Sequence, residues 1–400
     1  MGDTSTQLVT VSGPDHPGIA GRLFAALASL DSVILDVEQV HVHGRLLLCV
    51  EIDRWQGEPG DLSAVLIDAL GPLGAGLDVA ASALDATADN PGGAGHLVTL
   101  LAPQLKTEDL AGVCARIAAS GANIDRIVRL SSYPVNSYEL AVSGGDPALL
   151  RSNLVEEAAR RGVDVAVQQA GLHRRAKHLI VLDADSTLLQ GEVIDQLAER
   201  AGCGEHVASI TASAMAGALD FGDALEARVA LLGGLNASVL DEVAADLVLA
   251  PGARTLVRTL KRLGYVTAIV TGGFVQVIDR LANELGIDHV AANELEIAHG
   301  RLTGRLVGPR VDRAGKAAAL VRFAELAGVP LAQTIAVGDG ANDLDMLATA
   351  GLGIAYNAKP VVRRAADTAL NVPYLDAILF MLGISREEIE AADEASKTGD

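Results

Sequence analysis

A strand, an acidic loop and a helix in residues 178–195 constrain the fold of this chain more than any other stretch. The apolar run from Leu179 to Leu182 has the length and branching of a buried strand. Asp183 and Asp185 follow it directly, and apolar residues at helical spacing begin at Val193. In an open parallel sheet this order places both carboxylates at the carboxyl end of a strand, where such folds bind ligands. Two carboxylates so close together need a cation, and Asp with Mg²⁺ indicates phosphate chemistry.

The size and charge of the chain narrow its class. Its 400 residues suffice for two or three domains, since a single core rarely grows beyond about 250–300 residues. The net charge of −20 argues against nucleic acid or an anionic membrane as a partner, because both are negatively charged and are bound through Lys and Arg side chains. Three scattered cysteines favour a reduced compartment, and we find neither a membrane-length apolar run nor a signal-like start. We therefore expect a soluble, cytoplasmic protein.

The same order of elements occurs twice in the first 170 residues. A strand–helix–strand–strand–helix–strand pattern spans residues 1–86 and returns in residues 95–170, with a segment of linker composition between them. This order predicts two α+β, ferredoxin-like domains that serve as regulatory or assembly modules.

The opening of the first copy, Val9 to Ile19, resembles an ACT domain, a module that often binds amino acids. Pro17 and Gly18 predict a tight turn that leaves helix N–H groups free for a carboxylate, and Asp15 would hold an ammonium group. A plain capped turn explains this motif equally well. The second copy lacks the Asp and Gly at residues 102–106, so there the resemblance supports the fold and not the ligand site.

Residues 178–385 predict a third, larger domain in which three strands end in polar loops. The loops contain Asp183 with Asp185, residues 271–273, and residues 339–343. Alternating strands and helices place these loops on one edge of a sheet, and Lys316 projects from a nearby helix. Together they supply carboxylates for a metal, with a hydroxyl, glycine N–H groups and a positive charge for phosphate.

Two further segments complete this domain. Residues 197–250 are helical in pattern and lie between the first and second strands of the predicted sheet, so we expect an inserted helical cap. Residues 386–400 are acidic and lack aromatic side chains, so we expect a disordered tail.

The motifs resemble those of the haloacid dehalogenase-like phosphotransferase superfamily. Asp183-x-Asp185-Ser-Thr, Thr271-Gly-Gly, Lys316 and Gly338-Asp339-Gly-x-Asn-Asp343 stand in the order of that family. The resemblance implies an α/β fold: a Rossmann-like, doubly wound parallel sheet with an inserted helical cap, preceded here by the two ACT-like domains.

The resemblance also implies a mechanism. Asp183 would be the nucleophile that forms an aspartyl-phosphate. Mg²⁺ would be held by Asp183, the backbone carbonyl of Asp185 and Asp339. Asp185 would protonate the leaving oxygen and then take a proton from water, which requires a raised pKa.

Phosphoryl oxygens would be bound by three neighbouring loop residues and a lysine: Thr271, Gly272, Gly273 and Lys316. Asp343 would orient Lys316 or a metal-bound water, and Asn342 would contact substrate or phosphate. Two alternatives remain from the residues alone. Asp343 can be a helix N-cap, and Lys316 can be a solvated helix lysine.

Residues flanking the acidic loop and within the cap resemble phosphoserine phosphatases in particular. By that resemblance Glu192 meets the ammonium group of the substrate, Arg228 its carboxylate, and Met215 and Phe221 shield the closed site. Each has an ordinary alternative: first-turn dipole matching for Glu192, a surface pair with Glu226 for Arg228, and cap core for the other two.

The resemblance thus implies an Mg²⁺-dependent enzyme that hydrolyses O-phospho-L-serine to L-serine and phosphate, the last step of serine biosynthesis. One competing hypothesis transfers the phosphoryl group to another alcohol, or acts on another small phosphate ester. A second treats the chain as an amino-acid sensor with a vestigial phosphatase domain. We also expect L-serine as an effector of the first ACT-like domain, and a homodimer formed through the N-terminal domains.

Overall fold

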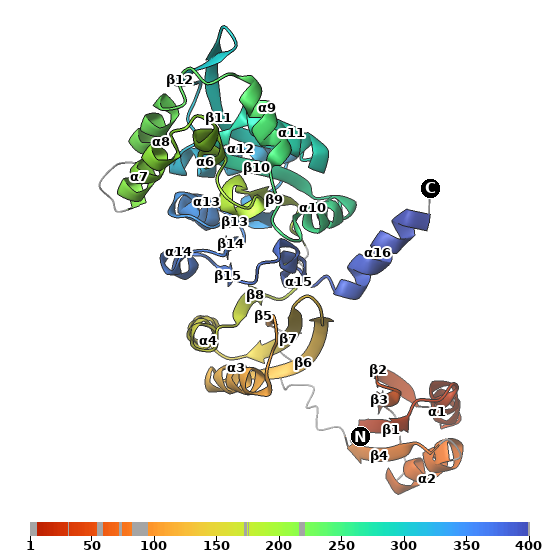
Figure 1. Ribbon diagram of the computed structural model, residues 1–400. Coiled ribbons are helices and arrows are strands. Elements are labelled where there is room, and N and C mark those ends of the chain that lie inside the picture. Colours follow the sequence, from red (N-terminus) through yellow and green to blue (C-terminus); the bar gives the residue numbers. More distant parts are fainter. Residues whose placement is uncertain are drawn as a thin grey trace. The chain divides into compact units, whose positions relative to one another are not determined.

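The computed structural model describes residues 6–30, 32–53, 59–71, 74–81, 95–171, 174, 176–215 and 221–398. The chain divides into two compact units, Met1–Asn90 and Pro91–Asp400 (Figure 1). Each unit is considered by itself below.

The first unit is a four-stranded antiparallel sheet with two helices, in the order β1 (Gln7–Pro14), α1 (Ile19–Ala28), β2 (Val33–Val42), β3 (Arg45–Asp53), α2 (Pro59–Leu70) and β4 (Gly76–Ala81). The strands lie in the order β2-β3-β1-β4. Burial alternates along β1 and β3, so each strand turns one face toward the core. Side chains from these strands and both helices form that core.

The edge strand β2 is exposed along its whole length. Its exposed side chains include six large apolar ones: Val33, Ile34, Leu35, Val37, Val40 and Val42. An exposed apolar edge strand of this length is suited to pairing with another chain.

The second unit begins with a sheet of the same design, formed by β5 (His96–Ala102), α3 (Thr107–Ala119), β6 (Ala122–Ser131), β7 (Asn136–Gly144), α4 (Pro147–Arg161) and β8 (Asp164–Gln169). Its strand order, β6-β7-β5-β8, repeats that of the first unit. Apolar side chains of α3 and α4 pack with those of the strands in one core.

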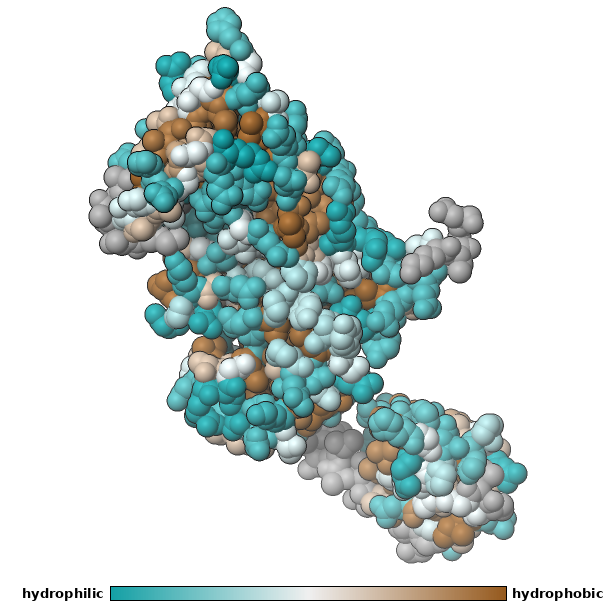
Figure 2. Space-filling model, in the orientation of Figure 1, coloured by the Kyte–Doolittle hydropathy of each residue, from teal (hydrophilic) through white to brown (hydrophobic). Residues whose placement is uncertain are grey.

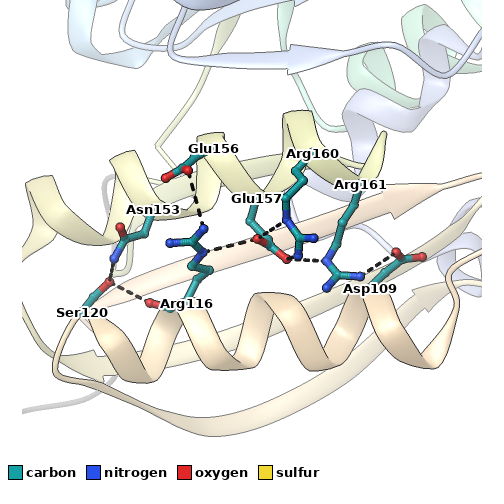
Figure 3. A network of polar contacts seen from close by, with 8 residues as sticks. All are labelled: Asp109, Arg116, Ser120, Asn153, Glu156, Glu157, Arg160 and Arg161. Carbon is teal, nitrogen blue, oxygen red and sulfur yellow. Dashed lines mark hydrogen bonds and ion pairs between the residues drawn. The ribbon is translucent and has the colours of Figure 1, made fainter.

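A buried carboxylate joins α3 to α4. Glu157 of α4 accepts hydrogen bonds from Arg160 and Arg161 of the same helix and from Arg116 of α3 (Figure 3). These arginines, Arg160 and Arg161 foremost, lower the pKa of Glu157 to about 2. Arg161 also reaches Asp109 of α3, at 3.5 Å. Glu157 and its arginine partners therefore connect α3 to α4 by ion pairs and hydrogen bonds.

The C-terminal part of the chain packs against this second ACT-like domain. Leu101 and Ala166 share one apolar core with residues 375–382. Arg174 lies 2.5 Å from Glu139 and donates two hydrogen bonds to the carbonyl of Met381, at 3.0 and 3.2 Å. The second ACT-like domain is thus built into the same unit as the larger domain.

The larger domain centres on a seven-stranded sheet in the order β12-β11-β10-β9-β13-β14-β15. The strands are β9 (Leu179–Leu182), β10 (Val266–Phe274), β11 (His289–Ala298), β12 (Arg301–Val307), β13 (Thr334–Gly338), β14 (Gly353–Tyr356) and β15 (Thr368–Leu370). All neighbours pair in parallel except β11 and β12, which form an antiparallel hairpin.

Helices cover both faces of this sheet. Ile180 and Leu182 of β9 point into a core with α6 (Val193–Arg200), α10 (Ala253–Arg262) and α11 (Val275–Leu285). Leu179 and Val181 point into the opposite core with α12 (Arg313–Ala327), α13 (Leu344–Thr349) and α14 (Pro360–Ala365). A strand buried on both faces explains the continuous apolar run. The predicted α/β architecture with a parallel sheet is confirmed.

The segment between β9 and β10 folds into α6, α7 (Gly204–Met215), α8 (Phe221–Ala230) and α9 (Ser238–Asp246) before α10 begins. A bridge between Leu189 and Leu249 closes the base of this segment. In Figure 1, α7 and α8 stand beside the end of the sheet to form the cap.

The prediction of a disordered tail is wrong for most of residues 386–400. After α15 (Ile378–Met381), helix α16 spans Arg386–Thr398, and most of its visible surface is hydrophilic (Figure 2). Its Ile389 is buried in the main core, and Asp393 lies 2.5 Å from Arg258 and from Arg262 of α10. The acidic residues of this segment suggested disorder, but one of them, Asp393, forms ion pairs with two arginines of α10.

Among the described helices, none combines the length and apolar composition that crossing a bilayer requires.

Candidate active site

Three adjacent strands deliver the motif residues to one edge of the sheet. β9 lies between β10 and β13, in parallel with both. Asp183 follows β9, residues 271–273 end β10, and Asp339 follows β13. Because the carboxyl ends of parallel strands share an edge, the loops meet where doubly wound folds bind ligands.

Lys316 lies at the centre of the site. Its Nζ is 2.7 Å from Oδ1 of Asp183 and 2.7 Å from Oδ1 of Asp343. All three side chains are almost completely buried, so Lys316 is not a solvated helix lysine. It stands in the first turn of α12, whose N-cap Asp312 accepts a hydrogen bond from the backbone N–H of Gly315.

Asp343 serves this lysine and not the N-terminus of α13. Its carboxylate makes no capping bond to that helix and instead accepts from Lys316 and from the Gly340 N–H. Gly338 leaves the room that this requires, since a Cβ at that position would come within 2.4 Å of the Asp343 carboxyl carbon.

A cluster of carboxylates next to Lys316 has the composition of a metal site. One oxygen each of Asp183, Asp339 and Asp343 lie within 4.8 Å of one another. Carboxylate oxygens are the ligands that Mg²⁺ prefers. Burial, with the charge of Asp343, raises the pKa of Asp339 to about 6, and the same two causes raise that of Asp183. The residues therefore fit a divalent cation, because the single lysine does not balance three carboxylates.

The carboxylate of Asp185 has hydrogen-bond partners different from those of this cluster. Its Oδ1 accepts from the Val193 N–H at the start of α6 (2.8 Å), and its Oδ2 accepts from the Thr271 hydroxyl (3.1 Å). Burial raises the pKa of Asp185, against the effect of the Val193 hydrogen bond. A raised pKa favours the protonated form of the carboxyl group, which is the form that a general acid needs.

The loop at the end of β10 places two hydrogen-bond donors, the Thr271 hydroxyl and the Gly273 N–H, beside Asp185. The Gly273 N–H donates to Oγ1 of Thr271 at 2.8 Å. A Cβ on Gly273 would lie 3.1 Å from Oδ2 of Asp185 and 3.2 Å from Oγ1 of Thr271. A residue without a side chain is therefore favoured here.

Glu192 stands beside this group at the entry to α6. Its Oε1 accepts from the Ser186 hydroxyl at 3.3 Å, and Ser186 adopts the left-handed conformation, with φ of +56°. Desolvation, followed by the charges of Asp185 and Asp339, raises the pKa of Glu192 to about 7. A cation bound beside Glu192 would offset these effects and favour its charged form.

Arg228 of α8 supplies a second positive charge. It is buried, and its Nε donates to the carbonyl of Ala224 at 3.3 Å. Its charge lowers the pKa values of Asp185 and Glu192 against the effect of burial. The alternative pairing with Glu226 is wrong, since Glu226 pairs with Arg310.

The remaining predicted residues are placed as follows. Asn342 is half-buried in the 3₁₀ turn Ala341–Asp343, beside Asp339. Met215 ends α7 and Phe221 begins α8, and their side chains lie outside the described part of the chain. Asp15, Pro17 and Gly18 belong to the first unit, where Gly18 is the N-cap of α1 with φ of +99°.

Sequence reasoning missed Asn293 of β11. Its Nδ2 donates to the carbonyl of Gly272 at 2.9 Å, and its Oδ1 accepts from the Val311 N–H at 2.9 Å. The only signal in the sequence is a polar residue beyond the apolar start of a further strand.

Family models match all three domains. A haloacid dehalogenase-like hydrolase model matches residues 180–348, and two ACT domain models match residues 94–168 and 5–79. The chain is 55% identical to a phosphoserine phosphatase of Streptomyces coelicolor over 394 residues, which cover 98% of this chain and 95% of that protein. It is 50% identical to one of Mycobacterium tuberculosis over 389 residues, which cover 96% and 95% of the two chains.

Solved structures are similar in fold as well. A HAD family hydrolase of Salmonella enterica superposes with a TM-score of 0.64 at 27% identity, over 72% of this chain and 98% of that one. A probable phosphoserine phosphatase of Vibrio cholerae gives a TM-score of 0.59 at 33% identity, over 74% and 88%.

Proposed function

The chain belongs to the phosphoserine phosphatase family of the haloacid dehalogenase-like hydrolases, and we propose that it hydrolyses O-phospho-L-serine through an aspartyl-phosphate on Asp183. One observation carries the proposal: Asp183 is buried against Lys316, while Asp185, two residues away, accepts hydrogen bonds from Val193 and Thr271 instead. A nucleophile and a separate acid/base thus stand at one strand end.

Asp183 attacks the phosphorus atom with a carboxylate oxygen, and the bond from phosphorus to the serine oxygen breaks. Lys316 and the Gly273 N–H bind the phosphoryl oxygens as their charge redistributes. Asp183, Asp339 and the backbone carbonyl of Asp185 would hold Mg²⁺, which would supply positive charge to offset the repulsion between the carboxylate and the phosphoryl group. Asp343 keeps Lys316 in place through their 2.7 Å contact.

Asp185 moves the proton in both halves of the reaction. In its protonated form it donates to the departing serine oxygen, and L-serine leaves. The resulting carboxylate then takes a proton from the water that attacks the aspartyl-phosphate, which releases phosphate and restores Asp183. The raised pKa of Asp185 and its fixed hydrogen bonds to Thr271 and Val193 support this role.

Recognition of serine falls to Glu192 and Arg228. A zwitterion needs one anion for its ammonium group and a forked cation for its carboxylate. Glu192 lies at the start of α6 and Arg228 lies on the cap helix α8, and the charge of Arg228 lowers the pKa of Glu192. A substrate that bridges them would hold the cap over the phosphoryl group.

The substrate assignment is tested by phosphate release from a panel of phosphate esters in the presence of Mg²⁺. We expect phosphoserine to be hydrolysed far faster than sugar phosphates or phosphorylated alcohols without an amino acid group. Equal rates across the panel would refute it. Loss of free phosphate when a second alcohol is added would indicate phosphoryl transfer instead.

We also propose that L-serine binds the first ACT-like domain at Asp15, Pro17 and Gly18, and does not bind the second. The N-terminus of α1 has no side-chain cap. The corresponding turn of the second domain is closed by its own groups, since Asp109 accepts from the Lys106 N–H and Asn136 accepts from the Leu105 N–H.

Calorimetry with L-serine on the full chain tests this assignment. We expect Asp15→Ala to remove one binding event and Asp109→Ala to remove none. A titration that Asp15→Ala leaves unchanged would contradict an effector site in the first domain.

Finally, we propose a homodimer that forms through β2. Its exposed apolar side chains and free edge support pairing with a second copy. Val40→Lys should shift the sedimentation coefficient to that of a monomer. Leu326→Lys, which changes an exposed leucine of α12, is the control. A dimer that persists in Val40→Lys would place the interface elsewhere.

A further inference from the structure

Asn293 connects the two segments that carry the phosphate-binding groups. It lies on β11, next to the strand that ends in residues 271–273, and its side chain is 1% exposed. The amide uses both ends: Nδ2 donates to the carbonyl of Gly272, and Oδ1 accepts from the Val311 N–H, each at 2.9 Å. A buried amide that is satisfied on both sides is held in a single orientation.

The first contact determines the direction of a donor. The carbonyl of Gly272 and the N–H of Gly273 belong to the same peptide group, which is planar and trans, so they point in opposite directions. Asn293 holds the carbonyl on one side and thereby turns the Gly273 N–H to the other. That N–H donates to Oγ1 of Thr271 at 2.8 Å, on the side of the loop that faces Asp185, and a phosphoryl oxygen bound there would take the place of this acceptor.

The second contact holds the segment that leads into α12. Val311 immediately precedes Asp312, the N-cap of that helix. Lys316 follows one turn later, and its backbone N–H donates to the carbonyl of Asp312 at 2.8 Å. Through Val311, the same amide therefore sets the start of the helix that carries the phosphate-binding lysine.

We propose that Asn293 is a positioning residue that aims the Gly273 N–H at the phosphoryl group and keeps this donor in register with Lys316. The inference rests on the proposed function, because it assigns the Gly273 N–H and Lys316 to the phosphoryl oxygens. Asn293 itself touches neither substrate nor metal in this role. A preorganised donor stabilises the transition state only if its direction is fixed beforehand, and Asn293 supplies that direction.

The chain offers a matched control that contacts the same strand two residues further along, at Leu295. Gln276 of α11 also braces β11 with both ends of its amide: Nε2 donates to the carbonyl of Leu295 at 2.8 Å, and Oε1 accepts from the Leu295 N–H at 3.3 Å. Neither contact involves Gly272 or the segment that leads to Lys316. Gln276→Ala therefore removes a similar brace without touching the phosphate-binding groups.

We expect Asn293→Ala to lower kcat for phosphoserine by about 10- to 100-fold, which is part of the loss seen when an oxyanion donor is removed outright. KM should change much less, since Glu192 and Arg228 bind the serine moiety independently. Asn293→Asp keeps an acceptor for Val311 but loses the donor to Gly272, so its kcat should fall to a similar extent. Gln276→Ala should keep the kcat of the unaltered protein.

A second measurement separates this role from plain stabilisation of β11. Orthovanadate with Mg²⁺ mimics the phosphoryl group, and its binding to the full chain is followed by thermal shift. We expect its affinity to fall about 10-fold in both Asn293 variants and to stay unchanged in Gln276→Ala.

Equal losses of kcat in Asn293→Ala and Gln276→Ala would overturn the proposal, as would unaltered vanadate affinity in the Asn293 variants. If Asn293→Ala fails to fold, Asn293→Asp alone decides, since it must lose vanadate affinity. The vanadate measurement does not depend on the substrate. If the unaltered protein binds vanadate but does not hydrolyse phosphoserine, the proposed substrate fails while the role of Asn293 is still tested.

Discussion

Lys316 lies 2.7 Å from Asp183, and both side chains are almost completely buried. Burial works against the charge of Lys316, but Asp183 and Asp343 outweigh it and raise the pKa of the lysine. The lysine is therefore charged at any physiological pH. A buried ion pair of this kind contributes little net stability, but removing one partner leaves the other uncompensated. This relationship places a permanent positive charge against the proposed nucleophile.

Asp183→Asn should abolish turnover while preserving the fold. The amide cannot form the aspartyl-phosphate, so we expect kcat to fall by ~10⁴-fold or more, as for other enzymes that lose their nucleophile. Lys316 keeps Asp343 as its partner, and the change removes one of three mutually repelling carboxylates, so the melting temperature without metal should rise. Phosphate release and thermal denaturation in a chelator measure the two effects. Substantial residual turnover would refute Asp183 as the nucleophile.

The KM for phosphoserine should depend on the ionisation of Glu192. Because desolvation and neighbouring carboxylates raise its pKa to about 7, Glu192 is increasingly protonated as the pH falls below that value. A neutral carboxyl group no longer attracts the substrate ammonium, so KM should rise between pH 8 and pH 6. Glu192→Gln should have a high KM at every pH in this range, measured from initial rates. A KM independent of pH in the unaltered enzyme would contradict this assignment.

The raised pKa of Glu192 also makes the stability of the fold depend on pH. Stability falls as the pH rises, whereas a carboxylate in a salt bridge makes stability rise with pH. A carboxyl group whose pKa is raised by folding contributes stability that is fully present below its unfolded pKa and is lost as the pH rises through about 7. Glu192→Gln should therefore weaken the decline of the melting temperature between pH 5 and pH 8.

Arg228→Lys tests recognition of the substrate carboxylate. Lysine keeps the charge but not the planar fork, so we expect kcat/KM for phosphoserine to fall about 10- to 100-fold, because a hydrogen bond to a charged group contributes about 1.5–3 kcal/mol. Glu226→Gln is the matched control on the same helix, since Glu226 pairs with Arg310. Similar losses in both variants would mean that the cap as a whole, and not Arg228, is responsible.

Glu157→Gln should destabilise the second ACT-like domain. Three arginines surround this buried carboxylate, and the change leaves them without their shared partner (Figure 3). We expect a clear fall in the melting temperature at pH 7. Glu156→Gln should have little effect, because Glu156 is exposed and lies 3.6 Å from Arg116.

The pH dependence of this cluster provides a second check. The arginines lower the pKa of Glu157 to about 2, so its contribution is present above the unfolded pKa of about 4.5 and is lost as the pH falls toward 2. The difference in melting temperature between Glu157→Gln and the unaltered protein should therefore shrink across that range. A constant difference would show that lost packing, and not charge, causes the destabilisation.

The acidic loop shows which features could be predicted from the sequence. The apolar run 179–182, the two aspartates and the periodicity from Val193 are local patterns, and each predicts a local element correctly. The same holds for the turns that end β10 and β13. Since parallel strands present their carboxyl ends together, these local elements suffice to predict that Asp183, residues 271–273 and Asp339 share one edge.

The ion pairs between distant segments show what could not be predicted from the sequence. Glu226 stands two positions from Arg228 in the sequence, yet it pairs with Arg310, 84 residues away. The acidic C-terminal segment has the composition of a disordered tail, but Asp393 finds Arg258 and Arg262 on α10. Composition and spacing describe one segment at a time and do not state which distant segment lies opposite.

By itself, the sequence therefore determined the α/β core, the helical insertion, the two N-terminal repeats and the set of side chains that gather at the sheet edge. Only the tertiary structure decided which carboxylates share Lys316, which cation Glu226 pairs with, and that Asn293 donates to the carbonyl of Gly272. The physical reason is range. Periodicity and turn chemistry act within a few residues, whereas a hydrogen bond or ion pair needs two atoms within about 3–4 Å, a distance that only the packing of remote segments sets.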